Sequence, residues 1–179
     1  MIRKVLNKIY QLSGWLAAVF LLLICLLVMV QVGCNLINKV SGMITGEAMG
    51  LTIPSYADFT GFLLAAASFL ALAYTLRAGS HIRVTLVYGN LGPGVRRIVE
   101  GWCLLFAASM TIYFTWYTGY LLYESYIYKD LSSGMIAVPL WIPQSAMLLG
   151  LLVLSISLVD DLFCLLFTGR TSYQPKFRK

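Results

Sequence analysis

The sequence predicts an all-α integral membrane protein with four transmembrane helices. Four apolar stretches, residues 12–37, 59–76, 98–122 and 142–167, reach or nearly reach the ~20 residues that a helix needs to span ~30 Å of hydrocarbon. Of 179 residues, 60% are hydrophobic and 11% charged, and the mean hydropathy is +0.83, which leaves too little polar surface to coat a water-soluble globule. The connectors hold at most about 20 residues, so we expect one membrane domain, residues 1–179, and no aqueous enzyme domain.

The basic residues predict the orientation of this domain. Three Lys and Arg residues lie in the N-terminal segment, four in the second connector and four in the tail, residues 168–179. The first and third connectors carry only Lys39 and Lys129. The positive-inside rule therefore predicts that both termini are cytoplasmic. Because the charges lie beside span ends, we expect no nucleic-acid partner despite a net charge of +6.

The first span is preceded by an amphipathic segment and ends on an amide-bearing face. In residues 1–11 the apolar side chains lie on one helical face and the basic side chains lie on the others, which predicts a short interfacial helix. The alternative is a segment that only orients the chain.

Gln31, Asn35 and Asn38 recur at i, i+4 and i+7, so their amides share one face. We expect this face to be buried, either within the bundle or against a partner.

The second span is rich in small residues at helix-packing spacing. Gly61 and Ala65 lie four residues apart, as do Ala67 and Ala71. In lipid, such residues let two helix backbones approach closely. The contact could again be internal or with another subunit.

The third span carries a stripe of tyrosines. Tyr113, Tyr117 and Tyr120, followed by Glu124, lie on one helical face that runs to the outer surface. Two interpretations remain open, an interfacial aromatic belt and a face that docks a second protein.

The remaining polar residues favour no catalytic or cofactor chemistry. The four cysteines lie in or beside apolar spans without a C-x-x-C pair, and a single histidine cannot supply a bis-histidine haem. Asp160 and Asp161 fall near the cytoplasmic end of the fourth span, where they could relay a proton or cation or pair with arginines of the second connector. We therefore expect no enzyme activity, no metal and no cofactor.

Two connector motifs suggest a family. The second connector reads as an interfacial segment and places Arg77, Gly79, His81, Ile82 and Val84 in an R-x-G-x-H-I-x-V pattern, with Arg83 between. Pro139, Trp141 and Pro143 mark the start of the fourth span. With four spans and cytoplasmic termini, the chain resembles the DctQ-like small membrane subunit of tripartite ATP-independent periplasmic (TRAP) transporters.

The resemblance implies a non-catalytic scaffold subunit in a bacterial inner membrane. A large DctM-like subunit would carry the Na⁺ and substrate sites, and a periplasmic binding protein would deliver an organic acid, sialic acid or a C4-dicarboxylate. Arg77, His81 and Arg83 would hold the cytoplasmic connector at lipid headgroups or against the partner, and the two prolines with Trp141 would fix the outer turn. The binding protein could touch four charged residues of the outer connectors: Glu47, Asp58, Lys129 and Asp130.

Two other functions remain as alternatives. The chain could be a self-sufficient homodimeric carrier, although its first span has no embedded acid. It could also be an assembly factor of another membrane complex.

Overall fold

The computed structural model describes residues 2–45, 47, 49–78 and 93–168, and it is helical apart from the connectors. The helices are α1 (Ile2–Thr45), α2 (Tyr56–Ala78), α4 (Pro93–Ile127) and α5 (Trp141–Thr168). Each contains a stretch long and apolar enough to cross a membrane. This confirms the predicted fold class.

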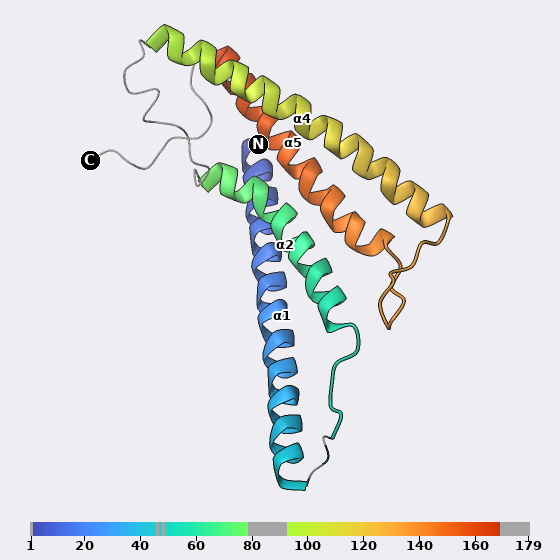
Figure 1. Cartoon of the computed structure of the whole chain (residues 1–179). Coiled ribbons are helices and arrows are strands. Elements are labelled where there is room, and N and C mark those ends of the chain that lie inside the picture. The colour runs from blue at the N-terminus through green and yellow to red at the C-terminus, as the bar shows by residue number, and fades with distance from the viewer. Residues whose placement is uncertain (1, 46, 48, 79–92, 169–179) are drawn as a thin grey trace, which may run out of the picture.

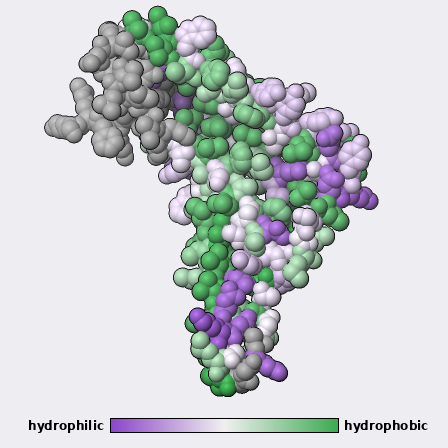
Figure 2. Space-filling view, in the orientation of Figure 1, coloured by the Kyte–Doolittle hydropathy of each residue, from purple (hydrophilic) through white to green (hydrophobic). Residues whose placement is uncertain are grey.

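The four helices form one layer instead of a closed bundle (Figure 1). Helix α2 packs against α1 on one side and α5 on the other, and α4 packs against α5. The spatial order is therefore α1, α2, α5, α4, with α1 and α4 at the edges. Because the layer is one helix thick, most large apolar side chains are exposed on its two faces and edges. Figure 2 shows hydrophobic residues over much of one face and hydrophilic residues toward the outer connectors.

Helix α1 runs without a break from Ile2 to Thr45, so no separate helix ends at residue 11. No proline interrupts this stretch. Tyr10, Ser13 and Ala17 are all buried, and the Ser13 hydroxyl donates a hydrogen bond to the Leu70 carbonyl of α2. Packing on α2 therefore holds the N-terminal segment in line with the first span.

Two glycines permit close approach between neighbouring helices. A Cβ atom on Gly14 would lie 2.6 Å from Cγ of Tyr74. A Cβ atom on Gly150 would lie 2.5 Å from the backbone carbonyl carbon of Phe69. Helix α2 thus meets α1 and α5 through positions where any side chain would collide.

The contact between α4 and α5 combines a small apolar core with hydroxyl groups. Leu104 and Ala108 of α4 are buried with Leu158 and Leu165 of α5. Farther along, the hydroxyls of Thr115 and Ser155 lie 3.1 Å apart. Each hydroxyl also bonds to a backbone carbonyl of its own helix at 2.8 Å, Thr115 to Thr111 and Ser155 to Leu151. The pairing therefore adds a polar contact between two hydroxyls that are already satisfied.

Candidate functional site: interhelical polar contacts and exposed faces

Arg77 joins three helices at the end of the layer that carries the N-terminus. Its guanidinium forms an ion pair with Asp160 and lies 3.8 Å from the Asp161 carboxylate. Nε donates to the Ser157 hydroxyl at 3.2 Å. On α1, the Tyr10 hydroxyl lies 3.4 Å from a terminal guanidinium nitrogen, and the guanidinium carbon is 4.6 Å from the ring centroid. We call these five residues the Arg77 cluster.

The Arg77 cluster is largely shielded from solvent. The side chain of Arg77 is 14% exposed, and that of Asp161 is 1% exposed. The sequence interpretation that Asp160 and Asp161 pair with arginines of the second connector is confirmed for Arg77. Within the described residues the guanidinium of Arg77 contacts α1 and α5. Its expected contact with lipid headgroups or a partner stays a prediction.

Gly79, His81 and Arg83 lie outside the described residues. They follow Arg77 in the second connector. Their expected role at the headgroups or against the partner therefore stays a prediction.

At the other end of the layer, amides of α1 hold the first outer connector. The Asn38 side chain accepts from the Leu51 amide at 2.9 Å and donates to the Leu51 carbonyl at 2.6 Å. The Gln31 side chain accepts from the Ile53 amide at 2.9 Å and donates to the Thr52 hydroxyl at 3.2 Å. We call these contacts the amide clasp.

The amide clasp explains the amide-bearing face of the first span. Gln31 is buried, whereas Asn35 is exposed and lies 3.3 Å from the Gln31 side-chain nitrogen. Of the two interpretations left open, the intramolecular one describes Gln31 and Asn38. Their partners are backbone and hydroxyl groups of a connector, not another helix.

The second outer connector folds onto the start of α2. Within it, the Ser132 amide donates to the Val138 carbonyl at 2.9 Å, and Leu131 forms an isolated bridge with Pro139. The Ile136 amide donates to the Ser55 hydroxyl at 2.9 Å, which ties the connector to the turn before α2.

The outer turn contains the three residues predicted to fix it. Helix α5 begins at Trp141, whose ring meets Tyr126 of α4 edge-on, with centroids 6.1 Å apart. Pro139 accepts a hydrogen bond from the Ile142 amide at 3.2 Å. Pro143 lies in the first turn of α5, where its missing N–H has no intrahelical partner to lose.

The four charged residues of the outer connectors differ in exposure. Glu47, Lys129 and Asp130 are exposed. Asp58 is half-buried, and a Cβ atom on Gly134 would collide with its carboxylate. Three of the four side chains are thus exposed to solvent in the described part of the chain.

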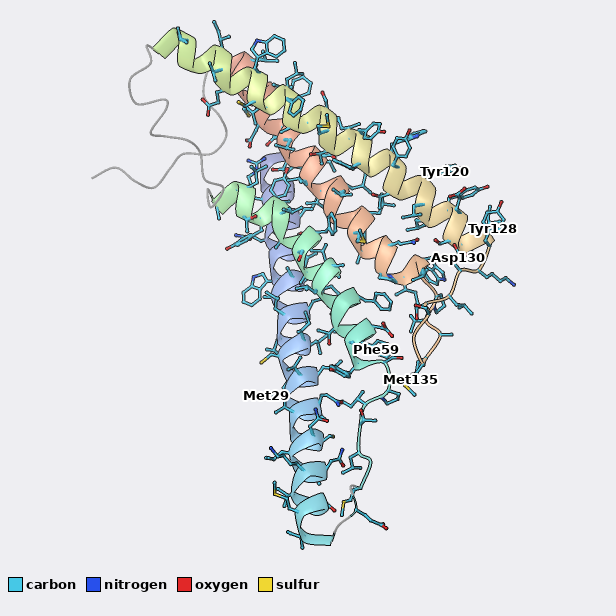
Figure 3. All side chains as sticks on the ribbon, viewed as in Figure 1. Met29, Phe59, Tyr120, Tyr128, Asp130 and Met135 are labelled. Atoms are coloured by element: carbon cyan, nitrogen blue, oxygen red, sulfur yellow. The ribbon has the colours of Figure 1, made fainter. Side chains whose placement is uncertain are left out.

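The tyrosine stripe lies on the free side of α4. Tyr113, Tyr117 and Tyr120 are each more than half exposed, and the rings of Tyr113 and Tyr117 lie 4.6 Å apart. Figure 3 shows Tyr120 and Tyr128 projecting from α4 away from α5, and Met29 projecting from the opposite edge on α1. Both edges of the layer therefore present side chains that no other described helix covers.

The small residues of α2 divide between two environments. Ala67 is buried, Ala65 and Ala71 are half-buried, and Gly61 is exposed. A Cβ atom on Gly61 would meet nothing within 4 Å. Among these small residues of α2, Gly61 is therefore exposed, whereas the three alanines pack against neighbouring helices of the layer.

Sequence reasoning missed Tyr10 and Ser157 as members of the Arg77 cluster. Tyr10, Ser13, Gly14 and Ala17 follow i, i+3, i+4 and i+7 spacing, a pattern that indicates a helix contact face. Ser157 lies three residues before Asp160, hence on the same face of α5. Both signals were available in the sequence.

Comparison with known proteins gives one family. The family described as "Tripartite ATP-independent periplasmic transporters, DctQ component" matches residues 44–168. This range contains α2, α4 and α5 and the end of α1. The searches of curated proteins and of solved structures found no significant match.

Proposed function

Because the chain belongs to the DctQ component family of tripartite ATP-independent periplasmic transporters, and so is the small membrane subunit of such a transporter, we propose that it is the fixed scaffold of that assembly. A large DctM-like subunit would move against it and carry the Na⁺ and substrate sites. A periplasmic binding protein would supply an organic acid, sialic acid or a C4-dicarboxylate. Both termini would lie in the cytoplasm.

The open helix layer is the observation that carries this proposal. A layer one helix thick offers a broad apolar face to a larger membrane protein, whereas a closed bundle would turn its apolar residues inward. Gly61 and the tyrosine stripe are exposed parts of this layer.

Internal cross-connections support a role as the stationary part. The Arg77 cluster joins α1, α2 and α5 at one end, and the amide clasp holds the first outer connector at the other. Ser55 ties the second outer connector to α2. A subunit held at both ends resists changes in helix order when a mobile domain slides along it.

Reconstitution tests the function. The tagged chain should co-purify with a stoichiometric large subunit, and proteoliposomes should take up the organic acid only with both membrane subunits, the binding protein and an inward Na⁺ gradient. Uptake by the chain alone as a dimer would support the carrier alternative. Co-purification with an unrelated complex, without uptake, would support the assembly-factor alternative.

A matched pair of variants tests whether the large subunit covers the start of α2. Gly61→Leu should leave the monomer folded, since a Cβ atom there meets nothing within 4 Å, but should weaken co-purification. Gly33→Leu is the control, because Gly33 is also a helical glycine whose Cβ atom would have no neighbour within 4 Å. Equal recovery of the large subunit with both variants would place the interface elsewhere.

A further inference from the structure

The second outer connector contains a loop that is closed on itself and apolar at its tip. The bridge between Leu131 and Pro139 closes residues 131–139, which we call the bridged loop. The loop has no charged residue. Met135 is 87% exposed, Leu131 57% and Ile136 43%. Exposed apolar side chains that are grouped in this way mark a contact with a membrane or with another protein.

The backbone of the bridged loop makes several of its hydrogen bonds within the loop. The Ser132 amide donates to the Val138 carbonyl at 2.9 Å. The Ser132 hydroxyl donates to the Ile136 carbonyl at 3.3 Å and accepts from the Val138 amide at 3.4 Å. These groups keep their partners when the loop leaves bulk water, which lowers the cost of moving it into the membrane interface.

Contacts with α2 place the bridged loop at the edge of the hydrocarbon core. The Ile136 amide donates to the Ser55 hydroxyl, and Gly134 lies against the side chain of Asp58. Figure 3 shows Met135 at the tip of the loop, beside the start of α2. Ser55 directly precedes α2, whose 23 residues extend about 35 Å, only slightly more than the ~30 Å of the core. Both ends of α2 therefore lie close to the core boundary, and so does the loop bound to its first turn.

Aromatic side chains at the base of the bridged loop indicate the same level. Tyr126, Tyr128 and Trp141 are exposed, and the rings of Tyr126 and Trp141 meet edge-on. Exposed tyrosine and tryptophan at span ends are typical of the headgroup region. The exposed apolar surface of the loop thus adjoins the lipid-facing ends of α4 and α5.

We propose that the tip of the bridged loop, formed by Leu131, Met135 and Ile136, inserts into the headgroup layer of the phospholipids at this end of the layer. The lipid surface fits better than a second protein, because the loop is bound at the core boundary and aromatic residues of the headgroup region flank it. Insertion would fix the depth of Ser55 and of the start of α2. The inference requires only that the helices span a membrane, so it depends neither on the large subunit nor on the side of the termini.

Depth-dependent fluorescence quenching in proteoliposomes tests insertion in the full chain. A genetically encoded fluorescent amino acid replaces Met135, and in a matched sample it replaces Met43 of α1, which is 75% exposed. Met43 lies about 18 Å beyond Gln31 along α1, and Gln31 binds the Ile53 amide near the start of α2. That distance exceeds the headgroup layer, which is about 5–7 Å thick on each side.

The two positions should differ in the quencher that reaches them. Phospholipids that carry a nitroxide at the headgroup or high on the acyl chain should quench position 135 and place it within about 7 Å of the core boundary. Iodide in the aqueous phase should quench position 43 more strongly than position 135. Both residues are highly exposed, so neither replacement disturbs the packing of the layer.

Photo-crosslinking in native membranes identifies what covers the loop in the complete assembly. The photo-reactive amino acid p-benzoylphenylalanine replaces Met135 or Met43, the tag is on this chain, and mass spectrometry identifies the adducts. We expect phospholipid adducts at position 135 and none at position 43.

Three results would overturn the proposal. Equal quenching by iodide at both positions would mean that the loop lies in water. Equal quenching by the lipid nitroxides at both positions would mean that the fluorophore, not the loop, enters the membrane. Protein adducts in place of lipid adducts at position 135 would mean that another subunit covers the loop. The depth measurement uses this chain alone, so it can fail while the scaffold function holds, and the reverse.

Discussion

Replacing Arg77 with leucine should destabilise the protein by about 3–5 kcal/mol, the usual cost of breaking a buried ion pair from one side. The substitution removes the charge-assisted bond to Asp160, which is worth about 1.5–3 kcal/mol, and the bonds to Ser157 and Tyr10, worth about 0.5–1.5 kcal/mol each. It also leaves the Asp161 carboxylate, whose side chain is 1% exposed, without its guanidinium.

The assay is the free energy of unfolding in mixed micelles, measured by titration with sodium dodecyl sulfate. Lys8→Leu is the control, because Lys8 is an exposed cation near the same end of the layer and its loss should change stability by less than about 0.5 kcal/mol. Adding Asp160→Asn to Arg77→Leu should cost less than the sum of the single changes, by at least about 1 kcal/mol. Equal destabilisation by Arg77→Leu and Lys8→Leu, or strictly additive effects, would refute the reasoning.

Three further changes address other contacts. Asn38→Leu removes both bonds to Leu51, so hydrogen exchange of the Leu51 amide should quicken and stability fall by about 1–3 kcal/mol. Gly150→Ala should lower the thermal midpoint of unfolding and cost about 1–3 kcal/mol, because the added methyl collides with the backbone of α2. Ser55→Ala should speed proteolysis of the second outer connector, because the Ile136 amide loses its acceptor, and leave helix content by circular dichroism unchanged.

For each of these three substitutions, a defined result would contradict the prediction. Gly33→Ala is the control for the glycine experiment and should be neutral or slightly stabilising, since its methyl meets nothing within 4 Å and alanine favours helix. A neutral Gly150→Ala would mean that α2 and α5 approach less closely. Unchanged exchange at Leu51, or unchanged proteolysis in the serine variant, would show that those connectors are held by other contacts.

The four helices could be predicted from sequence because their signal is local. An apolar run of about 20 residues defines a span whatever surrounds it. The pairing of Asp160 and Asp161 with an arginine could be predicted because the second connector carries four arginines, and the positive-inside rule places that connector at the same membrane face as the two aspartates.

Helix order could not be predicted, because it depends on contacts distant in sequence. Nothing local in Gly14 or Gly150 shows that one meets Tyr74 and the other Phe69. The amides of Gln31, Asn35 and Asn38 were predicted to be buried; Gln31 is buried, Asn38 is half-buried and Asn35 is exposed. Their spacing does not reveal that Gln31 and Asn38 bind a connector.

For the N-terminal segment, a local pattern was present but did not determine where the helix ends. Its amphipathic pattern predicted an interfacial helix, and the structure continues it into the first span. The pattern describes which residues are apolar but not what covers them. Here buried Tyr10 and Ala17 show that α2 covers one side.

Because α1 is so long, it projects beyond the other helices at the end of the layer opposite the N-terminus. Its 44 residues extend about 66 Å at 1.5 Å per residue, beyond the ~40–45 Å of a bilayer with its headgroups. The stretch from Gln31, which binds the connector before α2, to Thr45 alone adds about 21 Å. As Figure 1 shows, α1 ends well past the connector between α4 and α5. A protein that docks on this end of the layer would contact α1 at one edge before it reaches the connector between α4 and α5 at the other. It could therefore bind in only one rotational orientation.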